Sequence, residues 1–189
     1  LTIASAYWSV IDLPLATFGL VASGMSLMGY FVPRVAKYLA ETRTPTQNFC
    51  LLCIILMLGL LGIAEAFPYW GILPAILLYS TMQAMNYLAS RYLNEHAPSE
   101  KRATVLSFRG LSTNVSYGAV SLLYSSLIAW IKTQEDKAHL FRPELNEQEA
   151  VFVEALGWFP WYFLFTLIFS VLFYRFRFKK NLSLTNDRS

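Results

Sequence analysis

The sequence predicts an all-α fold, a polytopic membrane helix bundle of five transmembrane helices that forms one half-domain over residues 1–189. Only 14% of the residues are charged, whereas about a quarter of a soluble domain is charged. The charges are clustered, and the uncharged runs between them reach the roughly 20 residues that a helix needs to cross the hydrocarbon core. The expected spans are residues 7–32, 47–66, 69–92, 103–131 and 155–174.

The first expected span is interrupted by Asp12 and Pro14, and a polar segment from Pro33 to Thr46 follows it. Asp12 is the main ionisable candidate, because burying an ionised carboxylate in a membrane costs free energy and marks functional sites. It falls in the outer third of the span, where water is near. Asp12 is therefore either a proton-coupling group in an outer cavity or a hydrated residue at the interface.

The second and fifth expected spans are almost entirely apolar, and such helices can face lipid around their circumference. Cys50 and Cys53 form a Cys-x-x-Cys pair inside the second span. That spacing suggests redox or metal chemistry only with exposure and further ligands. The two histidines, His96 and His139, fall on different loops. We therefore expect two packing cysteines, with no metal and no cofactor.

Polar residues follow one face of the third and of the fourth expected span. The stripes are Tyr79, Gln83, Asn86 and Ser90 in the third span, and Ser107, Gly110, Asn114, Tyr117, Ser121 and Ser125 in the fourth. Buried amides in hydrocarbon cost free energy unless they find a partner or a wet cavity. The first, third and fourth spans should therefore face an interior, with the other two outside them. The predicted substrate-cavity residues are Gln83, Asn86, Asn114 and Tyr117.

The stripes either line a substrate cavity or form plain helix–helix interfaces. The second alternative remains because small residues at four-residue spacing and hydroxyl groups also pack helices together. If the stripes do line a cavity, they carry no fixed charge at mid-membrane, which favours a neutral or hydrophobic solute. Arg109 lies about two turns into the fourth span, where it either extends to the membrane surface or pairs with an acid on a helix outside the chain.

Basic residues set the expected orientation. The segments after the first, third and fifth spans hold eleven Lys or Arg residues, and the other loops hold three, diluted by acids. The positive-inside rule then places the N-terminus outside and the C-terminus in the cytoplasm. We expect a multi-pass protein of the cell (inner) membrane. Because topology explains the net charge of +3, nucleic acid is not an expected partner.

Two of the basic segments resemble loops of the major facilitator superfamily of secondary transporters. Residues 29–37, Gly-Tyr-Phe-Val-Pro-Arg-Val-Ala-Lys, are similar to that family's Gly-x-x-x-Asp-Arg-x-Gly-Arg signature. Gly29, Arg34 and Lys37 match it in type, whereas Pro33 replaces the acid and Ala36 the second glycine. Residues 98–107, with Pro98 before Arg102-Ala-Thr, resemble the segment that precedes the family's eleventh span.

The resemblance implies that the chain corresponds to spans eight to twelve of a twelve-helix fold. Its partners would then be the bilayer, a small-molecule substrate and an N-terminal six-helix half. Because the sequence starts at Leu1, we expect it to be a fragment of such a protein. It implies secondary active transport by alternating access, with H⁺ coupling as one option. The residues assigned to an inner gate are Gly29, Arg34, Lys37, Arg102 and Arg109.

Two other functional classes are compatible with a membrane protein. A membrane enzyme would need His, Asp or Cys residues gathered at one membrane face, and the sequence offers no such group. We therefore expect no enzyme and no catalytic residues. A non-transporting membrane receptor or partner subunit with the same fold remains the alternative, because fold does not fix function.

Overall fold

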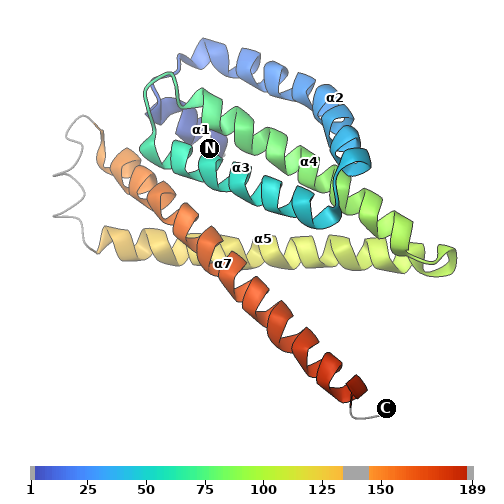
Figure 1. The fold of residues 1–189 in the computed structure, drawn as a ribbon. Coiled ribbons are helices and arrows are strands. Elements are labelled where there is room, and N and C mark those ends of the chain that lie inside the picture. The colour runs from blue at the N-terminus through green and yellow to red at the C-terminus, as the bar shows by residue number, and fades with distance from the viewer. Residues whose placement is uncertain (1–2, 134–144, 187–189) are drawn as a thin grey trace.

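The computed structural model describes the backbone of residues 3–133 and 145–186 and the side chains of residues 4–133 and 145–176. Within those ranges the chain folds into helices joined by short turns and forms no strand (Figure 1). The all-α prediction is confirmed there. Several residues used in the sequence predictions lie outside the described residues: Lys137, His139, Arg142, Arg188 and the side chains of Arg177, Lys179 and Lys180.

The described part contains six α-helices and two short 3₁₀ helices. They are α1 (Ile3–Val10), η1 (Leu15–Thr17), α2 (Phe18–Thr42), α3 (Pro45–Glu65), α4 (Ile72–His96), η2 (Ser99–Lys101), α5 (Arg102–Lys132) and α7 (Glu147–Asn186). Four segments are long and apolar enough to cross a membrane: Leu15–Thr42, Pro45–Glu65, Ser99–Lys132 and Glu147–Phe176. The helix α4 has 25 residues as well, but its polar stripe lowers its hydropathy. The third expected span, residues 69–92, and with it the count of five, therefore stays a prediction.

The first span differs from the expected helix over residues 7–32. The chain breaks after α1, because Asp12 adopts a left-handed backbone conformation with φ 60° and Pro14 has an extended conformation before η1. The helix α2 then continues through Pro33 to Thr42, so the expected loop shrinks to two residues, Arg43 and Thr44. Figure 1 shows α2 bending in its C-terminal part, as a proline that removes a helical hydrogen bond explains.

The helix α3 begins and ends with clear local signals. The Thr44 hydroxyl accepts from the Gln47 backbone N–H and the Gln47 side chain accepts from the Thr44 N–H, which forms a capping box. Pro45 occupies the first turn, where its missing N–H costs nothing. At the other end Ala66 is left-handed, with φ 46°. These signals place α3 within two residues of the expected second span.

Two glycines bring α3 close to α4. A Cβ added at Gly59 would lie 2.6 Å from Leu78 Cδ2, and one added at Gly62 would lie 2.6 Å from Pro74 Cβ. The helix α3 also packs along α7. The second span is therefore enclosed on two sides, whereas the sequence predicted a peripheral position, because its small residues let a neighbouring backbone approach.

One end of the bundle, here called the aromatic end, is closed by α1. This short helix packs against the turn between α3 and α4 and against the start of α7, and Tyr7, Ile11 and Phe152 belong to the buried cluster there. The Tyr69 N–H donates to the Ile11 carbonyl oxygen at 2.8 Å, and the Tyr7 hydroxyl donates to the Gly71 carbonyl oxygen at 3.0 Å. These bonds hold α1 as a cap rather than as part of a span.

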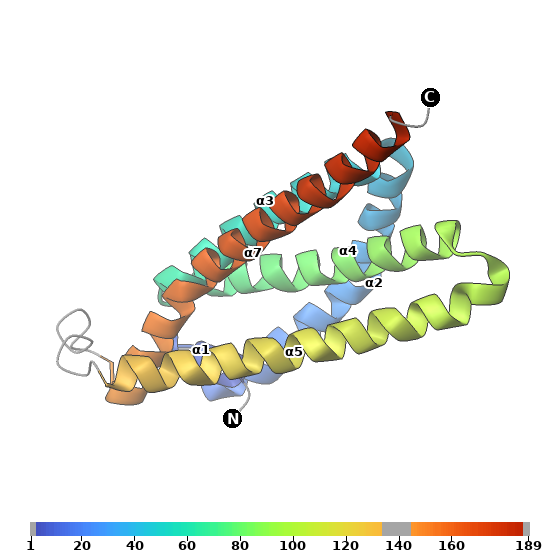
Figure 2. The same cartoon turned by 90° about the horizontal axis from the view of Figure 1, so that it is seen from below.

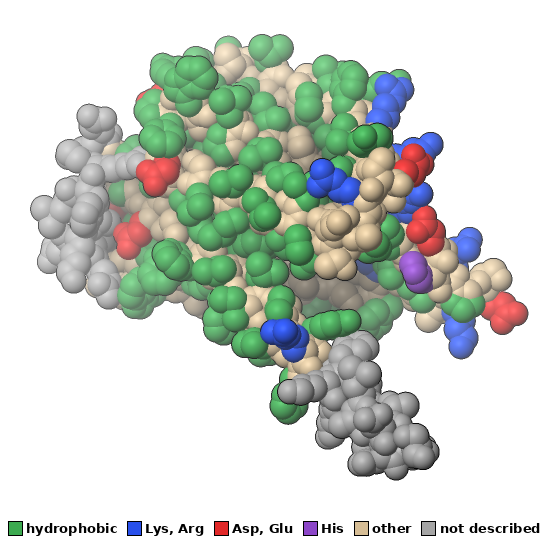
Figure 3. Space-filling view, viewed as in Figure 1, with side chains coloured by type: hydrophobic (Ala, Val, Ile, Leu, Met, Phe, Trp, Pro, Cys, Tyr) green, Lys and Arg blue, Asp and Glu red, His purple; other side chains and the backbone are tan. Residues whose placement is uncertain are grey.

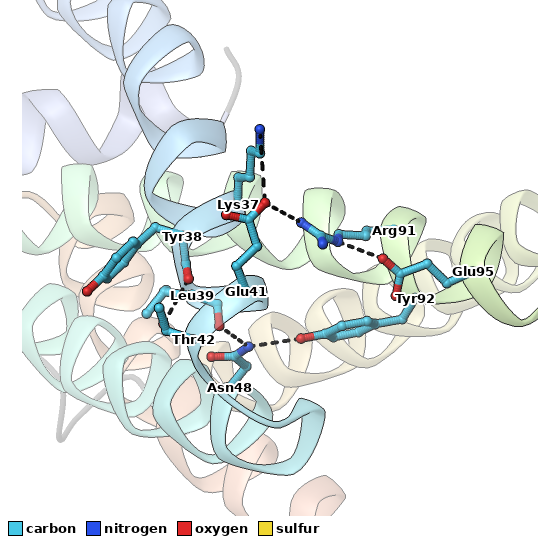
Figure 4. Close-up of polar contacts among 9 residues, drawn as sticks. All are labelled: Lys37, Tyr38, Leu39, Glu41, Thr42, Asn48, Arg91, Tyr92 and Glu95. Atoms are coloured by element: carbon cyan, nitrogen blue, oxygen red, sulfur yellow. Dashed lines mark hydrogen bonds and ion pairs between the residues drawn. The ribbon is translucent and has the colours of Figure 1, made fainter.

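The opposite end, here called the basic end, carries the turn between α2 and α3 and the elbow between α4 and α5. Ala36, Leu52, Ala84 and Leu88 form its buried cluster. Beside them Asn48 is buried, and its side-chain amide donates to the Leu39 carbonyl oxygen and to the Tyr92 hydroxyl, both at 2.9 Å (Figure 4). One residue of α3 thereby joins α2 to α4.

Replacing Asn48 with alanine is expected to lower the free energy of unfolding by about 2 kcal/mol, because two partners lose a buried donor. Tyr92→Phe removes one of the two bonds and should cost about 1 kcal/mol. Thermal unfolding in detergent measures both, with Asn114→Ala, an exposed asparagine on α5, as the matched control. An Asn48→Ala loss no larger than the control's would refute this role for the amide.

The helix α5 contacts the other helices mainly near its two ends (Figure 2). Near the aromatic end Leu127 and Ile131 pack with Val151 and Ala155 of α7. Near the basic end α5 meets α4. Between these contacts, residues 110–123 are all exposed. The expected interior position of the fourth span is therefore seen only at its ends within the described residues.

Candidate functional site

The polar stripe of α4 is the first part of the candidate site. The Gln83 side-chain amide donates to the Tyr79 hydroxyl at 3.2 Å, so these two members of the stripe are partners across one helical turn. Gly29 of α2 lies opposite: a Cβ added there would be 3.6 Å from Gln83 Nε2. Gly29, expected at the gate, thus packs against an expected cavity residue, and α2 crosses the stripe at this point.

Arg109 of α5 completes the stripe at the basic end. Its guanidinium donates to both the side-chain and the backbone oxygen of Asn86, each at 3.2 Å, and to the Ser90 hydroxyl. Asn86 and Ser90 lie one turn apart on α4, so a single guanidinium connects both to α5. The partners expected for Arg109 were the membrane surface or an acid on another helix. In the described part of the chain its partners are neutral groups of α4.

The predicted cavity residues are not all brought together. Gln83 and Asn86 lie on the same face of α4, but Asn114 and Tyr117 are exposed on α5. At 100° per residue Asn114 points about 140° around α5 from Arg109, the residue that faces α4. The expected set of four therefore lies on two separate surfaces, and the contact between α4 and α5 is made by a residue that was assigned to the gate.

Asp12 lies in an exposed turn between α1 and η1 at the aromatic end. The break in the helix at this residue takes its carboxylate out of the span to which the sequence assigned it. The two sequence interpretations, a coupling group in an outer cavity and a hydrated interface residue, both stay predictions. The turn of Asp12 lies beside the turn that precedes α4, whereas Gln83 and Asn86 lie near the middle of that helix.

The remaining gate candidates lie at the basic end. The Arg34 guanidinium carbon is 4.0 Å from the centroid of the Tyr30 ring, and the Arg34 guanidinium also donates to the Tyr30 hydroxyl. Arg102 donates to the Asn94 carbonyl oxygen at 3.4 Å, across the elbow. These contacts hold each arginine against its own helix or the neighbouring turn.

Lys37 belongs to a chain of ion pairs that joins α2 to α4 (Figure 4). Glu41 lies 4.0 Å from Lys37 Nζ and 3.7 Å from Arg91 Nη1, and Arg91 Nε donates to Glu95 at 2.7 Å. About half of the Glu41 and of the Glu95 side chain is exposed, so solvent screens these pairs and they add little to the stability of the fold. The main effect of Glu41 and Glu95 is to neutralise the positive charge of Lys37 and Arg91.

A cavity of about 440 Å³ lies elsewhere, between α1, α5 and α7 at the aromatic end. Its lining combines apolar side chains with five polar or charged residues: Ser9, Lys132, Asn146, Gln148 and Glu149. None of the predicted site residues lines this cavity. Among the described residues, no group of three or more His, Cys, Asp or Glu side chains is placed to hold a metal ion.

The sequence missed one feature of this site: the bond between Arg109 and the stripe of α4. Their contact depends on the rotation of α5 about its axis, which the sequence does not reveal because polar residues occur around much of this helix. Comparison with known proteins finds no matching family model, and no curated protein or solved structure with significant similarity. The candidate function therefore rests on the residues themselves.

Proposed function

We propose that this chain is the C-terminal part of a secondary active transporter that moves a small solute across a membrane by alternating access. In this proposal it supplies spans eight to twelve of a major facilitator fold, and a six-helix N-terminal half completes the pathway. The solute passes along the polar face of α4, where Gln83 and Asn86 bind it, and Asn114 and Tyr117 of α5 contribute from the adjoining surface.

One observation carries the proposal: Arg109 of α5 forms hydrogen bonds with Asn86 and Ser90 of α4, so two long helices meet through polar groups. Ionisable groups inside membrane helices are rare, and they mark solute or ion pathways more often than structural sites. The Gly29–Gln83 contact extends the same polar surface towards α2. Three helices of the chain therefore approach one polar strip.

The exposed apolar surface supports a membrane setting and a further helical half. Hydrophobic side chains cover most of the face seen in Figure 3. Large exposed examples occur on three different helices: Leu20 and Leu27 of α2, Phe108 and Leu122 of α5, and Phe165 and Phe173 of α7. Soluble monomers rarely expose apolar patches of this extent. Lipid on one side and the second half on another would cover these surfaces.

The charge distribution supports a cytoplasmic basic end. Figure 3 shows most Lys and Arg side chains gathered, together with some acidic ones, on the side where α2 and α4 end, whereas the opposite side shows acidic side chains. By the positive-inside rule this end, and the C-terminus with it, faces the cytoplasm. Arg34, Lys37 and Arg102 then lie at the cytoplasmic mouth, where they act as the inner gate.

Uptake by the full-length protein in proteoliposomes tests this function. We expect at least one solute from a chemically diverse labelled panel to accumulate above the level in empty liposomes. Collapsing the proton gradient with a protonophore then tests coupling, and Asp12→Asn tests whether that carboxylate takes part. Saturable binding of a solute without flux under any imposed gradient would refute transport and favour the alternative, a non-transporting receptor or partner subunit of the same fold.

A further inference from the structure

The charge on Arg109 is the least explained feature of the candidate site. Arg109 is seven residues into α5, so its Cα lies about 10 Å along the helix from the basic end. Its side chain is neither fully exposed nor fully buried, and it extends towards α4 rather than back to the elbow. A guanidinium in this position remains charged, because arginine does not lose its proton in proteins.

No carboxylate balances this charge within the described residues. The ion pairs seen there are Lys37–Glu41, Arg91–Glu41 and Arg91–Glu95, all nearer the basic end. Arg109 instead donates to an amide oxygen, a backbone oxygen and a hydroxyl. These groups fix the direction of the guanidinium without neutralising it. A cation held in place without a compensating carboxylate attracts an anion, and more strongly where a bilayer excludes water.

The guanidinium also keeps donors for a ligand. Arginine has five N–H groups, and the three bonds to α4 use Nη1 once and Nη2 twice. At least two donors, on Nε and Nη1, therefore have no protein acceptor in the described part of the chain. Charged donors held in a fixed plane suit the oxygens of a carboxylate or phosphate group.

From this geometry we infer that Arg109 binds an anionic oxygen group, a carboxylate or a phosphate, of the transported solute. The inference rests on the proposed transport function and names its substrate class as small oxyanions. It replaces the neutral or hydrophobic solute expected from the sequence, because that expectation counted no fixed charge on the polar stripe. Asn86 and Ser90 act as positioning residues that hold the guanidinium for the anion.

Binding to the purified full-length protein tests the inference directly. The probes are acetate, succinate and inorganic phosphate, each compared with chloride at equal ionic strength and with the neutral solute glycerol. We expect at least one oxyanion to raise the melting temperature of the wild type. Arg109→Gln should weaken its binding about 10- to 100-fold, as the loss of a charge-assisted hydrogen bond predicts. Arg109→Lys keeps the charge and should retain part of the binding.

Arg175→Gln is the matched control, because Arg175 is exposed on α7 and its replacement changes the net charge equally. Its oxyanion affinity should equal that of the wild type. Gel filtration of each variant shows whether it is folded, and Arg109→Lys keeps the comparison informative if Arg109→Gln unfolds. Equal oxyanion affinity in wild type and Arg109→Gln, or no oxyanion binding to the wild type, would overturn the inference.

Two further outcomes separate this inference from its premises. If Arg109 stabilises the protein only in nanodiscs that contain phosphatidylglycerol, and not in phosphatidylcholine with soluble oxyanions, the anion is a lipid phosphate and the solute assignment is overturned. Flux of a neutral solute that Arg109→Gln leaves unchanged would overturn it as well, while transport itself would stand. Oxyanion binding through Arg109 without flux would instead support the site and refute the transport function.

Discussion

A protein in which Gln83 and Asn86 are both leucine is expected to insert and fold but to lose transport by about 100-fold or more. Each replacement removes a polar group from the strip along α4, and a group left without its partner costs about 1–3 kcal/mol. Asn86→Leu also removes one acceptor of Arg109, the side-chain oxygen, and keeps the backbone one. If both costs apply to the transition state for translocation, their sum slows transport by about 100-fold or more, since each 1.4 kcal/mol is about tenfold.

The measurement is uptake, into proteoliposomes, of the solute that the wild type accumulates. Thr166→Leu with Ser170→Leu is a matched control, since these residues lie one turn apart and exposed on α7, away from the strip. That variant should transport at the wild-type rate. Wild-type uptake by the Gln83→Leu, Asn86→Leu protein would remove α4 from the pathway, and the stripe would then be a helix–helix interface.

Gly62→Val is expected to destabilise the protein by about 3 kcal/mol, the upper part of the usual range for overpacking. The new Cβ would lie 2.6 Å from Pro74 Cβ and 3.1 Å from Pro74 Cγ. A proline ring has no alternative rotamer into which it can move, so the backbones of α3 and α4 must separate. The loss also reaches α7, because α7 packs on the same helix α3.

Thermal unfolding in detergent measures this effect, and Gly118→Val provides its control. A Cβ at Gly118 meets no atom within 4 Å, so this variant makes the same chemical change in an open position. It should unfold within about 0.5 kcal/mol of the wild type, as surface replacements usually do. Equal stability of the two valine variants would show that α3 and α4 do not depend on this close approach.

The sequence predicted the helices well where a single hydropathy signal decides them. The second expected span matches α3 because Thr44, Pro45 and Gln47 mark its start, and the fourth matches α5 within one residue at each end. The prediction of the first span was wrong at its start because Asp12 and Pro14 act together. The positive φ of Asp12 and the extended conformation of Pro14 end a helix that hydropathy alone would continue. Pro33, read as a stop, only bends α2.

The candidate site was predictable in part. The face of α4 that carries Gln83 and Asn86 follows from helical spacing, and the structure places both on the side where α2 and α5 approach. The rotation of α5 does not follow, because polar and apolar residues alternate around much of its surface. Asn114 was therefore favoured over Arg109, although a bond made by one long side chain sets the actual contact.

The exposed middle of α5 bears on how such a chain can diverge in evolution. The helix is fixed by Arg109 near one end and by Leu127 and Ile131 near the other. Replacements over residues 110–123 alter the surface that α5 presents while leaving the contacts at both ends intact. Selection for folding therefore constrains the side chains of this segment only weakly. New specificities can accumulate here by drift, with the ancestral scaffold unchanged.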